Sequence, residues 1–289
     1  MAALTGRADL HCHSTCSDGM LSPEQLVHKQ ADAGVSVMSL TDHDTTEGLK
    51  QARTLCSERG ITFINGIELS ASFHGTSVDV LGYGFHEESA VLQSYLSHVR
   101  DLRIIRMERM LEQCQKNGVL VTIDDLAPFV TGSVPARPHL AKALVHLGYA
   151  SSIQNAFRRY VGSSAPCYVN KQEEVHPLEA ASLIQQAGGF AVIAHPVYYG
   201  LDQELSSWLQ DTRIDGVEVY HRDHIEQDMA RYKRMTEDAE TRSRTLLKTG
   251  GTDYHHESFG RTGEYIGASQ LPYEEAVRTV NHVKGGRSQ

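Results

Sequence analysis

The chain has 289 residues, with 27 Lys and Arg against 36 Asp and Glu, which gives a formal net charge of −9. Hydrophobic residues make up 40% and charged residues 22%, a globular composition that excludes a disordered or fibrous protein. The acidic balance argues against stable binding of long nucleic acids, which needs a basic surface, but it is compatible with a small basic pocket. The five cysteines form no CxxC pair and no apolar run approaches 18 residues, so we expect a cytoplasmic protein with reduced thiols and no membrane contact.

Short apolar runs alternate with amphipathic stretches, a pattern typical of βα repeats in an α/β fold. In the first repeat, Ser22 is a helix N-cap before Pro23, and Gly34 ends the helix after about residue 33. In chain order the pattern predicts strands over 35–40, 61–68, 78–85, 190–194, 215–219 and 246–249, and helices over 22–33, 47–59, 179–187, 225–240 and 272–283.

The βα rhythm is interrupted in the middle of the chain. A long amphipathic helix is predicted over 89–118, and short helical pieces follow at 138–147 and 152–160 between Pro- and Gly-rich connections. We therefore expect a barrel domain formed by residues 1–88 and 176–289, which carries the metal site. Residues 89–175 are expected to form a helical insertion that acts as a substrate-binding lid.

Six predicted strands end in or lead to His, Asp or Glu: a first strand that ends at residues 9–13, and those over 35–40, 61–68, 190–194, 215–219 and 246–249. In a parallel barrel these residues meet at one rim. His11 and His13 are two residues apart in an extended segment and project to the same side, whereas Cys12 points away. A lone His at a strand end is more often a hydrogen-bonded structural residue, but carboxylates at six strand ends would repel one another without cations. Imidazoles and carboxylates without thiolates favour Zn, Mn or Fe. Eight strong candidate ligands exceed what one tetrahedral ion uses, so we expect two or three divalent ions.

Five ordered motifs make the chain similar to a known family. They are DLHCHSTCSDG (9–19), LTDHDT (40–45), GIELS (66–70), AHP (194–196) and GTDYH (251–255). The chain resembles the PHP (polymerase and histidinol phosphatase) family, and in particular bacterial phosphoesterases with a helical insertion. That subgroup includes enzymes that remove the 3′-phosphate from nucleoside 3′,5′-bisphosphates and a 5′→3′ exoribonuclease. The resemblance implies a distorted (β/α)7 TIM-like barrel, the PHP fold, with a trinuclear metal site.

The resemblance also implies a set of metal ligands. They match the family positions at His11, His13, Asp18, His43, Glu68, His195, Asp253 and His255. One position departs, because Asp79 stands where close relatives carry a His. Aspartate can coordinate a metal, but it is a harder ligand than imidazole and shifts the preference toward Mn or Fe. His74 is an alternative to Asp79, although an isolated loop His is expected to face solvent.

A phosphorylated substrate needs cationic contacts. The long predicted helix carries an arginine every three residues, at Arg100, Arg103, Arg106 and Arg109. Such spacing is equally typical of a solvated helix face, but Arg103 and Arg137 align with phosphate-binding arginines of the resembling phosphatases. Lys171 is a weaker candidate for substrate binding. His224 matches a substrate-side His that would contact phosphate or protonate the leaving oxygen, a catalytic role for which His195 is the other candidate.

We therefore expect a metal-dependent phosphoric monoester hydrolase that acts on a small nucleotide-type substrate, such as a nucleoside 3′,5′-bisphosphate, with short oligonucleotides as further candidates. A metal-bridging hydroxide would attack phosphorus in line, and the arginines would stabilise the developing charge. Histidinol-phosphate phosphatase activity is the main alternative. An amidohydrolase acting on a C–N bond is less favoured, because Asp18, Glu68 and the Asp253–His255 pair fit three ions and a phosphate better. A non-catalytic metal-bound module is the remaining alternative.

Overall fold

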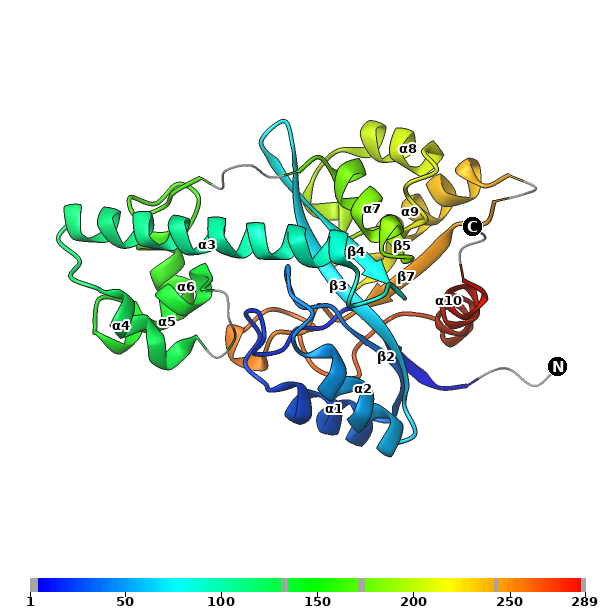
Figure 1. The fold of residues 1–289 in the computed structure, drawn as a ribbon, viewed down its shortest axis with the longest axis horizontal. Helices are drawn as coiled ribbons and strands as arrows, with labels where there is room; N and C mark the ends of the chain where they lie inside the picture. The colour runs from blue at the N-terminus through cyan, green and yellow to red at the C-terminus, as the bar shows by residue number, and fades with distance from the viewer. Residues whose placement is uncertain (1–4, 131, 133–134, 171–174, 242–243, 287–289) are drawn as a thin grey trace.

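The computed structural model describes residues 5–130, 132, 135–170, 175–241 and 244–286 (Figure 1). Within this part of the chain seven strands form one sheet in sequence order. Backbone bonds between the first and last strands nearly close the sheet into a barrel, since Leu10 N donates to Gly250 O (3.2 Å) and Asp253 N donates to His11 O (2.7 Å). The strands are β1 (Arg7–Asp9), β2 (Val35–Leu40), β3 (Thr62–Phe73), β4 (Thr76–Tyr83), β5 (Phe190–Ile193), β6 (Gly216–His221) and β7 (Leu247–Gly251).

Strand β4 runs antiparallel to both of its neighbours, whereas the other described strands pair in parallel. The predicted end of β3 at residue 68 is wrong, because its pairing with β4 continues to Phe73, opposite Thr76. Glu68 therefore lies inside a long hairpin rather than at a strand end. The reversed direction of β4 also brings Asp79, opposite Ser70, to the rim where the parallel strands end.

Helices cover the outside of the sheet, and the first begins as its sequence predicts. Ser22 Oγ accepts a hydrogen bond from Gln25 N (3.2 Å), and Gln25 Oε1 accepts one from Ser22 N (3.0 Å). The last helix buries Ala276 and Val280 in a hydrophobic cluster that includes Leu247 of β7. The helices of this domain are α1 (Pro23–Asp32), α2 (Leu49–Glu58), α7 (Pro177–Gln186), α8 (Asp202–Gln210), α9 (Glu226–Ala239) and α10 (Tyr273–Gly285).

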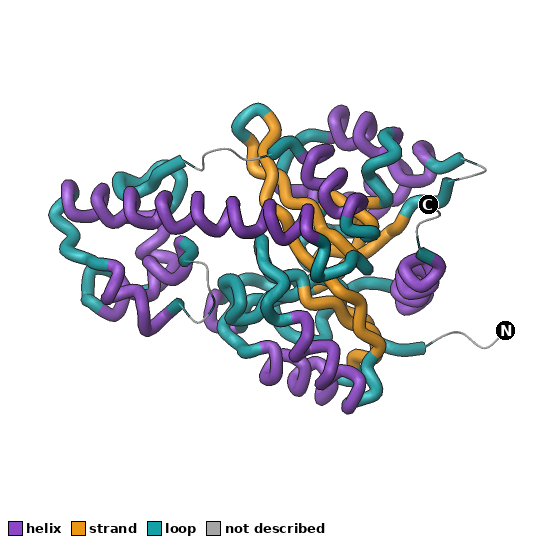
Figure 2. Tube along the Cα trace, viewed as in Figure 1, coloured by secondary structure: helices purple, strands orange, loops and turns teal. Residues whose placement is uncertain are grey.

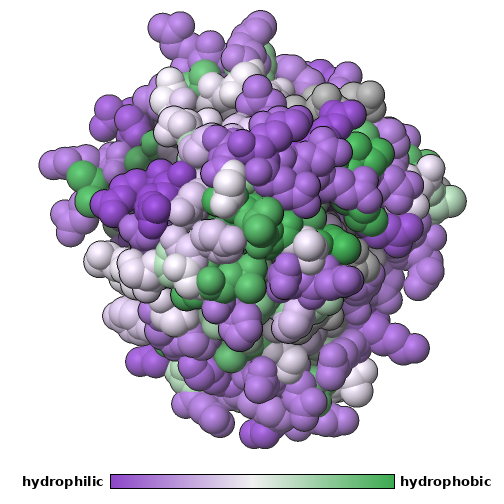
Figure 3. Space-filling model, turned by 90° about the vertical axis from the view of Figure 1, so that its left-hand side faces the viewer, coloured by the Kyte–Doolittle hydropathy of each residue, from purple (hydrophilic) through white to green (hydrophobic). Residues whose placement is uncertain are grey.

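The segment between β4 and α7 is helical in its described residues and projects from one side of the barrel (Figures 1 and 2). It has a hydrophobic core of its own, which includes Met110, Leu126, Leu140 and Leu144. Its end is mostly hydrophilic, with a few hydrophobic side chains near the middle of that face (Figure 3). The elements are α3 (Ala90–Lys116), α4 (Ile123–Leu126), α5 (Arg137–His146), α6 (Ile153–Ala156) and a π-helical turn, η2 (Phe157–Val161).

A buried histidine at the start of α5 makes stability depend on pH. His139 Nδ1 accepts a hydrogen bond from Ala136 N (3.0 Å), and burial lowers the pKa of His139 to about 4. The native side chain therefore stays neutral where an unfolded histidine, with a pKa of about 6.5, takes up a proton. We expect this residue to cost up to about 3 kcal/mol of unfolding free energy as pH falls from about 6.5 to about 4.

The matched variant is His139→Asn, whose side-chain oxygen can accept the same bond but does not titrate. Urea unfolding at pH 7.5 and pH 5 should show a smaller acid-induced loss of stability in the variant than in the unmodified protein. Equal losses in both proteins would contradict the assignment.

Candidate metal centre

Glu68 of β3 lies at the centre of a group of histidines at the barrel rim. Its Oε2 lies 3.2 Å from a ring nitrogen of each of His11, His13 and His43. Its Oε1 lies 3.0 Å from His195 Nε2. The Glu68 side chain is fully buried. Because its two oxygens lie next to four imidazoles, this carboxylate can connect several ligand sets.

The first cluster joins the segment after β1, strand β3 and the loop after β7. Ligand atoms of His11, His13, Glu68 and Asp253 all lie within 4.8 Å of one another. Asp253 Oδ1 is 3.1 Å from His13 Nε2 and 3.5 Å from His11 Nε2. The spacing of His11 and His13 thus brings both imidazoles to one side, as an extended segment requires.

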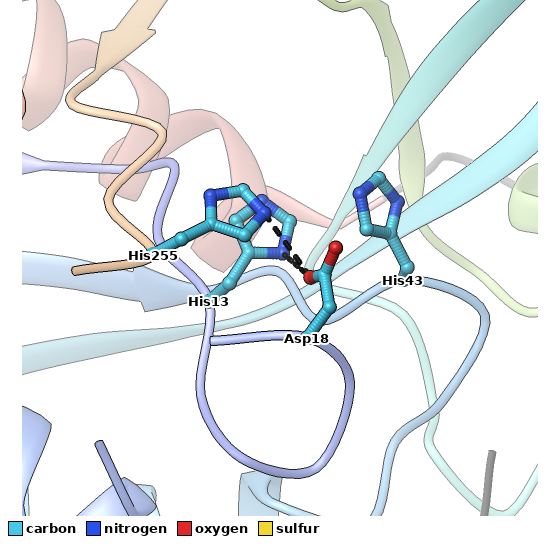
Figure 4. Close-up of side chains that lie close together, drawn as sticks. All are labelled: His13, Asp18, His43 and His255. Carbon is cyan, nitrogen blue, oxygen red and sulfur yellow. Dashed lines mark ion pairs between the residues drawn. The ribbon is translucent and has the colours of Figure 1, made fainter. Parts of the chain in front are cut away.

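The second cluster contains His13, Asp18, His43 and His255, again with ligand atoms within 4.8 Å (Figure 4). Asp18 Oδ1 lies 3.1 Å from His255 Nε2 and 4.0 Å from His13 Nδ1. In Figure 4 the Asp18 carboxylate points toward these two rings from a loop below them.

The third cluster contains His43, Glu68 and Asp79. His195 lies beside it, with Nε2 3.9 Å from Asp79 Oδ2. The structure therefore brings the predicted ligand residues, Asp79 included, to one rim of the barrel. His74 lies in the exposed turn between β3 and β4 and packs on the ring of Phe73, outside these clusters.

Neighbouring carboxylates orient the ligand loops. Glu218 Oε1 lies 3.0 Å from His11 Nδ1, and Glu218 Oε2 accepts a hydrogen bond from His195 N (2.8 Å). Asp42 accepts bonds from the loop that carries Asp18, namely from the backbone and side chain of Ser14 (2.7 and 2.6 Å) and from the side chain of Ser17 (2.6 Å). Such partners fix the orientation of ligands in metal sites.

Two of the predicted ligands have an unusual backbone conformation. His195 and Asp253 have φ of 20° and 45°, values that residues other than glycine adopt rarely. The bonds from His195 N to Glu218 and from Asp253 N to His11 O hold these conformations. Strained backbone of this kind is concentrated at functional sites.

The charges of the clusters are strongly coupled. Burial disfavours protonation of His13, but Asp253 and Glu68 beside it outweigh burial and raise the pKa of His13 to about 10. Burial raises the pKa of the Glu68 carboxyl, but His43 and His11 hold it well below its usual range. The carboxylates therefore stay ionised in a buried site and require nearby positive charge, which protonated histidines or metal ions can supply.

Several buried imidazole nitrogens in the described part of the chain are free of hydrogen bonds, which also fits metal binding. Within the described residues, both ring nitrogens of His13 and Nδ1 of His43 have no partner in hydrogen-bond geometry, although all three are buried. Buried polar atoms rarely lack a partner unless an ion or water supplies one. The donor set of imidazole and carboxylate suits Zn, Mn or Fe.

The clusters form one side of a cavity of about 590 Å³, and the insertion forms the other. Arg103 from α3 contacts Asp44 and donates to Ser70 Oγ (3.1 Å), which connects the insertion to the barrel. Arg137 lies over the ring of Tyr168, 5.6 Å from its centroid. Among the described residues, four arginines line the cavity: Arg103, Arg106, Arg137 and Arg261.

The structure places His224 outside the residues described as lining the cavity, and its predicted contact with the substrate stays a prediction. His224 is 2% exposed, and its ring centroid lies 5.4 Å from that of His221. The contact between His224 Nδ1 and Val219 O (2.8 Å) turns the ring into the turn after β6. His195 does line the cavity, but both its ring nitrogens face partners, which favours a ligand role over proton donation. Lys171 lies outside the described residues.

The sequence analysis missed several residues of the site. Arg261 lines the cavity, packs over Phe259 (5.6 Å) and pairs with Glu264. Tyr199 Oη contacts the third cluster. Both lie in loops without periodicity, and the one available signal was their closeness in sequence to His255 and His195.

This fold and site define a barrel protein with candidate metal-ligand clusters at one rim. The chain belongs to the PHP domain family, whose model matches residues 9–256. It is 35% identical over 212 residues, 73% of this chain and 76% of the relative, to a 5′-3′ exoribonuclease of Haemophilus influenzae. It is 30% identical over 267 residues, 91% of each chain, to a 3′,5′-nucleoside bisphosphate phosphatase of Chromobacterium violaceum.

A solved structure agrees with the fold. The chain superimposes on a Bifidobacterium adolescentis protein, assigned as a metal-dependent phosphoesterase, with a TM-score of 0.85, 27% identity and 97% of each chain covered. These comparisons confirm the predicted family, the barrel and the enzyme class, a metal-dependent phosphoesterase. None of the helices in the described part of the chain has the length and hydrophobicity needed to cross a bilayer.

Proposed function

We propose that the protein hydrolyses a phosphate monoester of a small nucleotide, with a nucleoside 3′,5′-bisphosphate as the first candidate substrate. The observation that carries this proposal is a cavity lined by His–carboxylate clusters on one side and by Arg103, Arg106 and Arg137 of the insertion on the other. A substrate with two phosphates matches both features, since one phosphate can meet the metal centre while arginines hold the other. The Chromobacterium violaceum relative is named for such a bisphosphate.

The cofactor is two or three divalent transition metal ions, Mn, Fe or Zn. The three clusters and the neighbouring His195 supply their ligands: His11, His13, Asp18, His43, Glu68, Asp79, His195, Asp253 and His255. Such ions supply Lewis-acid stabilisation of phosphoryl oxygens and a water of lowered pKa.

The insertion acts as a lid that selects the substrate. Apolar side chains in the lining of the cavity offer a surface for a nucleoside: Met107, Ile153, Phe157 and Phe259. Arg137 is the first candidate for the distant phosphate, because its guanidinium packs on aromatic rings and keeps its charge toward the cavity. Arg103 is the second candidate, and Lys171 remains a third.

Short RNA is a second candidate substrate, since the Haemophilus influenzae relative is named an exoribonuclease. With added Mn, phosphate release should be measured on a nucleoside 3′,5′-bisphosphate, histidinol phosphate and p-nitrophenyl phosphate, and mononucleotide release on a 5′-phosphorylated oligoribonucleotide. The bisphosphate should have the highest kcat/KM, and EDTA should abolish turnover. Faster histidinol phosphate hydrolysis, or C–N cleavage without phosphate release, would contradict the proposal.

Asp79 serves as a metal ligand in place of an imidazole. Its carboxylate lies within 4.8 Å of ligand atoms of His43 and Glu68, where a negative charge would help to bind a cation. Asp79→Ala should lower kcat by about tenfold or more and reduce metal content. Asp79→His should retain substantial activity with an altered preference among Mn, Fe and Zn. Unchanged kinetics and metal content in Asp79→Ala would contradict this role.

A further inference from the structure

Asp79 of the third cluster and His195, which lies beside that cluster, share a hydrogen-bond partner. Tyr199 Oη accepts a hydrogen bond from Asp79 N (2.8 Å) and lies 3.0 Å from His195 Nδ1. Asp79 belongs to β4 and His195 follows β5, so one phenol oxygen joins two segments that are distant in sequence. Tyr199 is not among the residues that the predicted ligand set contains.

We propose that Tyr199 is a positioning residue that assembles the third cluster by holding Asp79 and His195 at a fixed separation. The proposal rests on the proposed function to the extent that it treats Asp79 and His195 as metal ligands. Hydrogen-bond partners of this kind fix the direction in which a ligand presents its lone pair.

The local backbone explains why Asp79 needs this partner. In the antiparallel pair, Asp79 O accepts from Ala194 N (3.0 Å), which continues the ladder between β4 and β5. β5 ends at Ile193, and the chain turns away through His195, with φ of 20°, and Pro196. In a longer β5, a backbone carbonyl would accept the hydrogen bond from Asp79 N. Because β5 ends early, the phenol oxygen of Tyr199 accepts this bond instead.

The ring of His195 needs the same partner for a different reason. Its backbone is outside the regular strand conformation, so the sheet does not define the direction of its side chain. The contact of Nδ1 with Tyr199 Oη directs Nε2 toward Glu68 Oε1 (3.0 Å) and Asp79 Oδ2 (3.9 Å). Without the Tyr199 hydroxyl, the His195 ring loses the contact of Nδ1, the ring nitrogen opposite the one that faces the cluster.

The ring of Tyr199 is held independently of its hydroxyl. It packs among apolar side chains below the rim, including Ile193, Leu205 and Trp208. Tyr199→Phe therefore keeps the ring packing and removes the one atom on which the proposal depends.

Metal content of Tyr199→Phe, loaded with Mn and freed of excess ion, should fall by about one equivalent per chain, or the weakest-bound ion should dissociate about 10- to 100-fold more readily. The metal-free variant should unfold at nearly the same urea concentration as the unmodified protein. Tyr198→Phe is the matched control, because Tyr198 Oη bonds Asp223 instead, and it should keep the full metal content. Full content and unchanged affinity in Tyr199→Phe would overturn the proposal.

A double-mutant cycle gives a second test if Tyr199→Phe perturbs the fold. In an Asp79→Ala background, Tyr199→Phe should weaken the affinity for Mn by less than it does alone, since the two residues serve one site. Additive effects would overturn the proposal. Metal binding is measured without substrate, so a protein that binds its ions but releases no phosphate would contradict the proposed function and leave this test intact.

Discussion

Replacing Glu68 by Gln should lower kcat by about 10³-fold or more and remove most of the bound metal. Gln has nearly the same shape, but it is neutral, and the Glu68 carboxylate faces four imidazoles at 3.0 to 3.2 Å. Loss of that charge affects the first and third clusters together. Phosphate release and metal analysis of the purified variant measure the two effects.

The matched control is Glu275→Gln, which neutralises a buried glutamate of α10 that pairs with Arg278. This control should keep the metal content and activity of the unmodified protein. If Glu68→Gln retains its ions and turns over within about tenfold of the unmodified protein, Glu68 is not the shared ligand that its geometry indicates.

Replacing Arg137 by Ala should raise KM for a nucleoside bisphosphate and lower kcat/KM by about 30-fold, or about 2 kcal/mol. Arg137 belongs to the insertion, away from the metal clusters, so its contact with a distant phosphate binds ground state and transition state alike. For p-nitrophenyl phosphate, which has one phosphate, the change should stay within about twofold.

Arg109→Ala is the control, because this exposed arginine of α3 is not among the residues described as lining the cavity. Its kinetics on both substrates should match those of the unmodified protein. Equal losses on both substrates in Arg137→Ala, or no loss on either, would show that the insertion does not bind a second phosphate through this residue.

Regular spacing made the centre of this site predictable. His11 and His13 lie on one side of an extended segment because side chains alternate along a strand, and the Ser22 capping box fixed the start of α1. Strand ends therefore indicated which residues meet at the rim. They did not distinguish ligands from their supports, since Asp42 and Glu218 also follow or lie in strands but hold loops through hydrogen bonds.

The other residues of the site lie on irregular backbone, which limited their prediction from the sequence. The position of His224 near a strand end did not reveal that its ring faces Val219 rather than the cavity. Arg261 and Tyr199 lie in loops whose direction depends on tertiary contacts, so local sequence carries no period that points to them. The continuation of β3 beyond Glu68 depends on its hairpin with β4, a pairing that propensity within a single strand does not determine.

The most direct measurement of the central claim combines metal analysis with phosphate release. Protein purified without chelator should contain at least two equivalents of transition metal per chain and should release inorganic phosphate from a nucleoside 3′,5′-bisphosphate. Removal of the ions should abolish turnover, and stepwise addition of Mn should restore it as the second and third equivalents bind. Full activity in the metal-free protein would contradict the account.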